Sequence, residues 1–292
     1  MSGTGYGKVI LFGEHFVVHG MPAIVAGLKN LKTIMDVEEG PWNSELDDKA
    51  KTGYAAVAKA CGVEGKTFAL DIKEMVPLKQ NLGSSAAFFV AFANALNKKY
   101  KRGMKKDAIN KAAYEGEKSI HGKPSGIDNS ASTYGKPLIF KKDAEGNFRI
   151  SRLKIGAPIH LLISNTGEKK GTGELVAQFG AMKEKYNVSG NVFALYKNVF
   201  TGAKNAIKEG NMEELGFLMG IDHSLLAVFG LSTPNIEKAR FLMGDNGALG
   251  SKITGAGGGG NIIGLFRGEE EANKAKAEME KEGFKSFYAR IE

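Results

Sequence analysis

Three glycine-rich segments, far apart along the chain, constrain most strongly what this sequence can fold into. They are Gly3-Thr-Gly-Tyr-Gly-Lys8, Leu82-Gly-Ser-Ser-Ala-Ala87 and Gly255-Ala-Gly-Gly-Gly-Gly260. Glycine loses more conformational entropy on folding than other residues, so such runs persist where side chains would block a ligand or another backbone. The chain has 39 glycines and only 7 prolines, and their clustering indicates backbone-mediated binding rather than low complexity.

The second segment precedes residues 86–96, a run that is apolar on every side and therefore predicts a buried helix. Free backbone N–H groups and the positive end of the helix dipole meet at such a start. Gly83 lets an anion approach, and Ser84 and Ser85 add hydroxyl groups, so the segment is suited to hold a phosphate. An ordinary serine N-cap explains the same residues equally well.

The other two segments each imitate a nucleotide motif without fulfilling it. Gly255, Gly257 and Gly260 satisfy G-x-G-x-x-G, but an apolar, strand-like run follows where a dinucleotide site needs a helix. We therefore expect the loop to contact a ligand in another way, with a structural turn as the alternative. The first segment is not a P-loop, because Val9 replaces the required hydroxyl residue and a strand follows Lys8.

The 292 residues are natural for two domains, and we place them at 1–157 and 158–292. Strands and helices mix without regular βαβ alternation, which predicts the α+β class. The expected strands are 6–12, 22–28, 33–38, 67–72, 159–164, 251–254, 261–266 and 284–291. The expected helices are 48–60, 86–96, 105–120, 174–186, 192–208, 212–229, 235–243 and 269–281, and residues 122–129 are expected to form a loop.

Composition narrows the class of protein. No apolar run reaches the roughly 18 residues that cross a bilayer, and the first residues do not resemble a secretory signal. The single cysteine, Cys61, fits a reducing cytoplasm. A formal charge of +8 favours anionic partners. Nucleic acid and phosphorylated small molecules are both candidates. Because the basic residues are scattered, we interpret their densest cluster, Lys98, Lys99, Lys101 and Arg102, as a solvated helix end rather than a nucleic-acid site.

Two carboxylates are candidates for chemistry. Glu117 lies beside the apolar stripe of the helix expected at 105–120, from which it can reach a metal ion or another cation. A solvent-facing glutamate is the more ordinary reading of that position. Asp128 follows the turn sequence Pro124-Ser-Gly-Ile and is suited either to cap a short helix or to act as a general base.

Taken together and in order, these segments resemble the GHMP kinases, named for galactokinase and for homoserine, mevalonate and phosphomevalonate kinases. The first motif is similar to Gly7-Lys-Val-Ile-Leu-Phe-Gly-Glu-His15, the second to residues 77–87 and the third to Lys252-Ile-Thr-Gly-Ala-Gly-Gly-Gly-Gly260. Within the family, Gly13-Glu-His-Phe-Val-Val-His-Gly20 and the stretch from Glu117 to Asn129 most resemble the members that act on mevalonate. The stretch Asn165-Thr-Gly167, followed by Thr172, resembles a further motif of those members.

The resemblance implies transfer of a phosphoryl group from ATP to the 5-hydroxyl of (R)-mevalonate, an early step of isoprenoid biosynthesis. It implies an N-terminal domain with a left-handed β-α-β unit, a ferredoxin-like C-terminal domain and a homodimer. By motif position, Asp128 is expected to be the catalytic base with Lys8 as its partner, and Ser85 and Glu117 to bind Mg²⁺. The expected ATP-binding residues are Lys79, Gln80, Asn81, Leu82, Gly83, Ser84, Ser85 and Ala86. The expected substrate-side residues are Lys8, Glu14, His15, Asp128, Thr172, Gly255, Ala256 and Gly257.

The chain departs from the family pattern at Lys79 and Asn81, where glycine is usual. Asparagine tolerates the left-handed backbone region, so we expect the loop to form, with altered affinity for the nucleotide. The alternatives are a related kinase for phosphomevalonate, homoserine or a sugar, and a ligand sensor without catalysis on the same fold.

Overall fold

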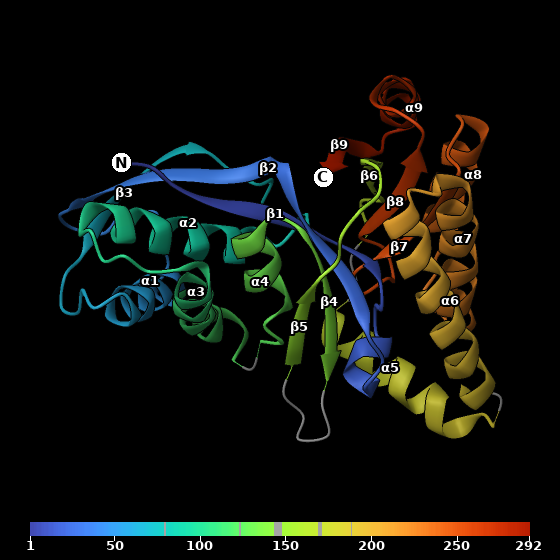
Figure 1. Ribbon diagram of the computed structural model, residues 1–292, viewed down its shortest axis with the longest axis horizontal. Helices are drawn as coiled ribbons and strands as arrows, with labels where there is room; N and C mark the ends of the chain where they lie inside the picture. Colours follow the sequence, from blue (N-terminus) through green and yellow to red (C-terminus); the bar gives the residue numbers. More distant parts are fainter. Residues whose placement is uncertain (79, 123, 143–147, 169–170, 188) are drawn as a thin grey trace. The chain divides into compact units, whose positions relative to one another are not determined.

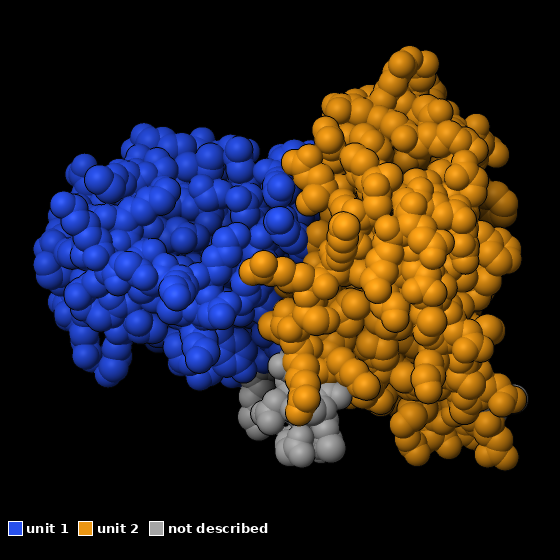
Figure 2. Space-filling model, viewed as in Figure 1, with its two compact units in different colours: residues 1–9, 26–136 blue, residues 10–25, 137–292 orange. Residues whose placement is uncertain are grey.

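The computed structural model describes residues 1–78, 80–122, 124–142, 148–168, 171–187 and 189–292. These residues form two compact units, shown in different colours in Figure 2: unit 1 contains residues 1–9 and 26–136, and unit 2 contains residues 10–25 and 137–292. Strands β1 (Gly3–Phe12) and β2 (Ala23–Glu39) each run through both units. The boundary expected at residue 157 stays a prediction, because the compact units are discontinuous in sequence.

Unit 1 packs helices against strands around an apolar core (Figure 1). Its further elements are α1 (Asp48–Ala60), β3 (Phe68–Glu74), α2 (Ser84–Lys99), α3 (Lys106–His121) and α4 (Ile127–Tyr134). Helix α1 begins as predicted, because the carboxylate of Asp47 accepts the N–H of Ala50 at 2.7 Å. Helix α2 is buried over most of its surface, as its uniformly apolar sequence predicts.

The glycines of the first segment have a packing role. A Cβ atom on Gly3 would lie 1.9 Å from the carbonyl oxygen of Ala91, and one on Gly5 would lie 2.0 Å from that of Ala87. Strand β1 therefore lies directly against helix α2, at a distance that side chains at these two positions would prevent. The close approach explains a glycine-rich strand without any ligand.

Unit 2 contains a 3₁₀ turn, η1 (Phe16–His19), a hairpin, and a helical layer on a second sheet. Its strands are β4 (Pro137–Lys142), β5 (Phe148–Arg152), β6 (Ile159–Asn165), β7 (Gly250–Thr254), β8 (Asn261–Phe266) and β9 (Lys285–Ile291). Its helices are α5 (Thr172–Lys185), α6 (Ser189–Glu209), α7 (Met212–Val228), α8 (Pro234–Asp245) and α9 (Glu269–Lys281).

The second sheet has the order β7-β8-β6-β9 with antiparallel neighbours. With helices after β6 and α9 after β8, this is the β-α-β-β-α-β arrangement of a ferredoxin-like domain, as expected. The other sheet has the order β1-β2-β4-β5, with β3 also paired to β2. The α+β class is therefore confirmed.

Three expectations about elements were wrong. The strands expected at 22–28 and 33–38 are one continuous strand, β2, whose polar middle stays extended. Helix α4 begins inside the loop expected at 122–129, and the β4–β5 hairpin was not predicted at all. Both missed features are short, and the eight residues of α4 are too few to show a helical period.

Candidate functional site

Lys8 and Asp128 form the central ion pair of unit 1. Lys8 lies on β1, where its backbone N–H donates to the carbonyl of Leu82 at 2.8 Å. Its Nζ atom is 3.0 Å from Oδ1 of Asp128, and the lysine side chain is 9% exposed against 36% for the aspartate. The pair thus presents a carboxylate to solvent beside a mostly buried ammonium.

The start of α2 has no side-chain cap, which is the property that an anion-binding helix start requires. Its N-cap is Gly83, which has a left-handed φ of 70° and cannot cap the helix with a side chain. The first helical bond is donated by the N–H of Ala87 to Gly83 at 3.0 Å, so among the described residues no side chain caps the N–H groups of Ser84, Ser85 and Ala86. The expected serine N-cap is thus contradicted, and the alternative, an anion-binding helix start, is favoured. Asn81 adopts a φ of 53°, as the sequence predicts for an asparagine in place of glycine.

Glu117 is buried, with 1% of its surface exposed, which overturns the reading of a solvent-facing glutamate. Burial raises the pKa of its carboxyl to about 7, against a hydrogen bond from Ser85 that lowers it. Among the described residues, its Oε1 atom has no hydrogen-bond partner. A buried carboxylate oxygen without a partner, next to a hydroxyl group, fits a hard divalent cation such as Mg²⁺.

The described residues contain no cluster of three or more His, Cys, Asp and Glu side chains that is suited to a metal ion. Ser85 and Glu117 would therefore supply two oxygens at most. Mg²⁺ commonly binds in this way, through one or two protein groups, substrate phosphates and water.

A network of amides holds the first turn of α4, which carries Asp128. The side chain of Asn129 donates to Oδ1 of Asn110 at 2.6 Å, and Asn110 donates to the hydroxyl of Ser130 at 3.0 Å. Ser130 in turn donates to the carbonyl of Gly126 at 2.7 Å, and Gly126 begins the helix with a φ of 80°. Asn110 lies on α3, seven residues before Glu117, so one helix face supports both carboxylates.

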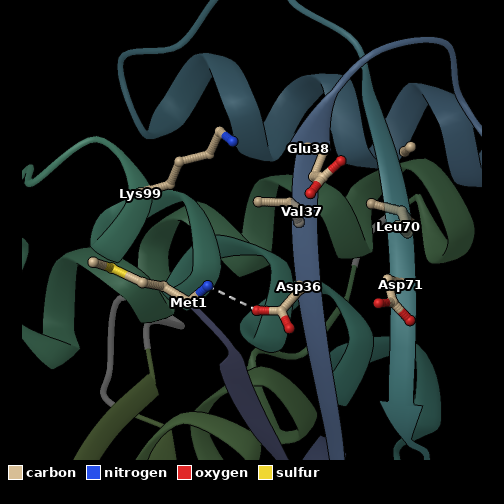
Figure 3. A pocket seen from close by; sticks show the side chains of 8 residues that line it. Met1, Asp36, Val37, Glu38, Leu70, Asp71 and Lys99 are labelled. Atoms are coloured by element: carbon tan, nitrogen blue, oxygen red, sulfur yellow. Dashed lines mark ion pairs between the residues drawn. The ribbon is translucent and has the colours of Figure 1, made fainter.

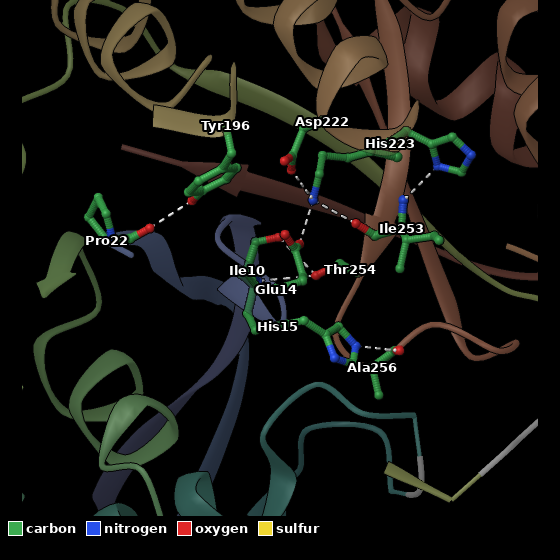
Figure 4. A network of polar contacts seen from close by, with 11 residues as sticks. Ile10, Glu14, His15, Pro22, Tyr196, Asp222, His223, Ile253, Thr254 and Ala256 are labelled. Atoms are coloured by element: carbon green, nitrogen blue, oxygen red, sulfur yellow. Dashed lines mark hydrogen bonds and ion pairs between the residues drawn. The ribbon is translucent and has the colours of Figure 1, made fainter. Parts of the chain in front are cut away.

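Unit 2 contains a buried cluster of three charges, shown in Figure 4. The Nζ atom of Lys252 lies 2.5 Å from Oε1 of Glu14 and 3.2 Å from Oδ2 of Asp222. It also donates to the carbonyl of Ile253 at 2.7 Å. All three charged side chains are 0% exposed. Burial raises the pKa of both carboxyls, while the lysine lowers them.

His15 follows Glu14 in a left-handed conformation, with a φ of 57°. Its Nε2 atom lies 2.7 Å from the carbonyl oxygen of Ala256, so Nε2 carries the proton. Its ring stacks on Phe179 with the centroids 5.2 Å apart. Desolvation lowers the pKa of His15, which keeps the ring neutral and leaves Nδ1 as an acceptor.

The glycines of the third segment divide into two groups. A Cβ atom on Gly257 would lie 2.8 Å from the carbonyl oxygen of Leu231, and one on Gly259 would lie 2.6 Å from Glu168. These two are required by packing within unit 2. Gly255, with a φ of 90°, would meet nothing within 4 Å, so the side of the loop toward Gly255 is the one open to a ligand.

Several expected site residues take part only through the backbone or lie outside the description. Leu82 and Ala86 are buried, so they can offer only main-chain groups. Lys79 lies outside the described residues, and so does the side chain of Thr172. The structure brings Lys8 to Asp128 and Ser85 to Glu117 in unit 1, and His15 to Ala256 in unit 2.

The sequence reasoning missed Asp222, Asn110 and the pairing of Lys252. Asp222 is a charge inside an otherwise apolar stretch of α7, and such a residue is almost never fully buried unless paired. A charged residue in such a stretch therefore indicates a buried ion pair, so Asp222 could have been found from the sequence. Asn110 gave none, since an asparagine on an amphipathic helix is ordinary.

A separate hollow of about 540 Å³ opens on the surface of unit 1 (Figure 3). It is lined by Met1, Asp36, Val37, Glu38, Ala69, Leu70, Asp71 and Lys99. None of the expected site residues is among them. Three carboxylates in one open hollow repel a triphosphate, so the hollow is not a nucleotide site.

No helix within the described residues is both long and apolar enough to cross a membrane. Two regions match models of one family: residues 48–136 match the GHMP kinases N terminal domain, and residues 203–285 match the GHMP kinases C terminal model.

Full-length relatives narrow the family further. Mevalonate kinase of Archaeoglobus fulgidus is 33% identical, over 97% of this chain and 98% of its own length. The Aeropyrum pernix mevalonate kinase is 30% identical, over 98% and 94% respectively. A crystal structure of L. major mevalonate kinase in complex with R-mevalonate matches with a TM-score of 0.90 and 28% identity, covering 100% of this chain and 96% of that one.

Proposed function

The chain belongs to the mevalonate kinase family of the GHMP kinases, and from this membership we propose that it transfers the γ-phosphoryl group of ATP to the 5-hydroxyl of (R)-mevalonate. The products are ADP and 5-phosphomevalonate, and the enzyme is a kinase with an alcohol as acceptor. The observation that carries the proposal is the Lys8–Asp128 pair at 3.0 Å, in the same unit as a helix start suited to phosphate.

In the proposed reaction, Asp128 accepts the hydroxyl proton of mevalonate. The hydroxyl oxygen bonds to the γ-phosphorus of ATP, and the bond from that phosphorus to the leaving ADP oxygen breaks. Lys8 holds the carboxylate of Asp128 in place and stabilises the negative charge that develops on the attacking oxygen. Phosphoryl transfer needs mainly positioning and charge neutralisation, and this pair contributes to both.

We assign the triphosphate to the start of α2. Its free N–H groups and dipole favour an anion, and the backbone of residues 80–83 leads into it with two left-handed residues, Asn81 and Gly83. Gln80, Asn81, Leu82, Ser84 and Ala86 would contribute there. Ser85 and Glu117 would hold Mg²⁺, which when bound neutralises phosphate charge.

We assign the mevalonate side to Lys8, Asp128, Glu14, His15, Thr172, Gly255, Ala256 and Gly257. The neutral ring of His15 supports this assignment, because its Nδ1 atom is an acceptor with no hydrogen-bond partner among the described residues. The open side of Gly255 supports it as well.

A coupled assay of ADP release tests the function. Purified protein is given ATP and Mg²⁺ with (R)-mevalonate, phosphomevalonate, homoserine or galactose. We expect turnover with mevalonate and at most trace turnover with the others. Turnover only with another acceptor would identify a different kinase of this fold. Nucleotide binding without any turnover, at every magnesium concentration, would indicate a sensor.

A homodimer and a cytoplasmic location complete the proposal. Sedimentation velocity at micromolar concentration would show the dimer, and a single species of about 31 kDa would exclude it.

A further inference from the structure

The Glu14–Lys252–Asp222 cluster joins segments that are distant in sequence. Glu14 and Lys252 are 238 residues apart. Glu14 lies in the turn after β1, Asp222 is on α7, and Lys252 is on β7, three residues before the third glycine segment. Burying three charges costs more than burying apolar side chains of the same volume, so stability alone does not explain the cluster.

Two more contacts join the same two chain segments as the ion pair of Glu14 with Lys252. The hydroxyl of Thr254 accepts the N–H of Ile10 at 3.2 Å and donates to its carbonyl at 2.9 Å. Further along the same segment, His15 bonds to Ala256 at 2.7 Å. All three contacts tie the segment 10–15 to the segment 252–256. His15 therefore contacts the residue that follows the open glycine, Gly255.

We propose that Lys252 and Asp222 are positioning residues for the acceptor: the ammonium, shared by two carboxylates, fixes Glu14 and the Gly13–His15 turn against the base of the third glycine segment. Asp222 holds the ammonium from α7, and the ammonium holds Glu14. The inference rests on the proposed function, because it assigns this turn and the glycine segment to the mevalonate side.

The charges of the cluster predict that binding of mevalonate depends on pH. Two carboxylates face one ammonium, and the hydroxyl of Tyr196 from α6 also interacts with both of them. Burial raises the pKa of Glu14 to about 7, and the neighbouring Asp222 contributes to the increase. As the pH falls through 7, Glu14 takes up a proton and its attraction to Lys252 weakens. The turn is then held less firmly, and the KM for mevalonate rises.

Asp222→Asn separates positioning from folding, because it keeps the shape of the side chain and leaves Glu14 and Lys252 as a balanced pair. With Asp222 neutral, the pKa of Glu14 decreases. We expect the acid limb of kcat/KM for mevalonate to move down by about one pH unit, as for removal of a nearby like charge. The KM for ATP is expected to stay within about twofold, since the nucleotide side lies in the other unit.

His223→Gln is the matched control. His223 is the next residue on α7, is equally buried and also contacts β7, where it accepts the N–H of Ile253 at 3.3 Å. Its other nitrogen faces Glu237 rather than Glu14. General loosening of the α7–β7 contact would affect both variants, whereas loss of the cluster charge affects only Asp222→Asn.

The experiment measures kcat and both KM values for wild type, Asp222→Asn and His223→Gln between pH 6 and 9, with calorimetric titration of mevalonate at two pH values. An acid limb that moves in Asp222→Asn alone supports the inference. If the acid limb of kcat/KM stays in place in Asp222→Asn, or if it moves equally in His223→Gln, the inference is overturned. A wild-type enzyme without mevalonate turnover would instead refute the proposed function, so the two failures are distinguishable.

Discussion

At the scale of single residues, the two carboxylates of unit 1 differ in surroundings and therefore in proposed task. Asp128 is partly exposed and paired with an ammonium, which suits a group that exchanges a proton with substrate. Glu117 is buried and has one oxygen without a partner in the described residues, which suits a metal ligand. We therefore expect substitution of Asp128 to affect the rate of the reaction and substitution of Glu117 to affect the requirement for Mg²⁺.

Asp128→Asn is expected to lower kcat by about 10² to 10⁴-fold, because the amide cannot accept the hydroxyl proton. Nucleotide affinity, measured by calorimetry, should remain close to wild type. The control is Asp107→Asn, in the first turn of α3, where the carboxylate accepts a bond from Tyr134. A kcat within threefold of wild type would reject Asp128 as the base.

Glu117→Gln is expected to raise the Mg²⁺ concentration that gives half-maximal activity, roughly tenfold or more, because a neutral amide is a weaker ligand for a hard cation. Glu115→Gln is the control on the same helix, since Glu115 pairs at 2.8 Å with Lys118 at the surface. A magnesium titration of both variants tests whether Glu117 is a ligand of Mg²⁺. Equal requirements in the two would contradict the assignment.

At the scale of elements, the short helix α4 matters because its first turn carries Asp128. The turn is held from α3 through Asn110, which contacts both Asn129 and Ser130. This polar anchor adds to the apolar contacts that the buried Ile127 and Ala131 of α4 make. Small displacements of a reacting group cost large factors in rate, so this anchor bears on catalysis.

Asn110→Ala is expected to lower kcat about tenfold with little change in either KM, since α4 loses its orientation but the binding groups remain. Asn110→Asp, which keeps the acceptor toward Asn129, should recover part of that loss. Asn97→Ala is the control, because Asn97 makes comparable bonds to the backbone of Met104 on the far part of α2. Losses of similar size in both alanine variants would point to destabilisation only.

Long periodic elements could be predicted from sequence, because local pattern determines them. An aspartate at 47 or 48 predicts the start of α1, and the apolar run after Ser85 predicts α2. The residues before that run fitted a serine N-cap and a phosphate site equally well, and the structure decides against the serine N-cap. The charge cluster could not be predicted, because no local rule pairs Glu14 with a lysine 238 residues later. Likewise, sequence reasoning favoured ligand contact over a structural turn for the third glycine segment, whereas Gly257 and Gly259 are required by their own neighbours.

At the scale of the whole molecule, buried histidines make stability depend on pH. Burial lowers the pKa of His223 to about 4, against an ordinary value of 6.5, and its Nε2–H donates to Glu237 at 2.8 Å. Between these two pH values the unfolded chain binds the proton and the folded chain does not. The contribution of neutral His223 is therefore complete above pH 6.5 and is lost as the pH falls toward 4.

We expect His223 to contribute a decrease on the order of 2 to 3 kcal/mol to the free energy of unfolding in urea between pH 7 and pH 4.5. Burial also lowers the pKa of His15, His19 and His160, and it raises the pKa of Glu14 and Glu117, which acts in the opposite direction, so wild type alone cannot isolate this term. The difference between wild type and His223→Gln at each pH does so. A difference that is constant with pH would refute the prediction.

The discontinuity of unit 2 has a consequence for biosynthesis. Residues 10–25 belong to a unit whose remaining residues begin at 137. The ion-pair partner of Glu14, Lys252, is translated 238 residues later. On the ribosome, this early segment emerges long before its partners are translated, with a carboxylate and apolar side chains such as Phe16 uncovered. The segment therefore stays exposed to wrong associations during that interval, and unit 2 can assemble only after the residues around Lys252 have been translated.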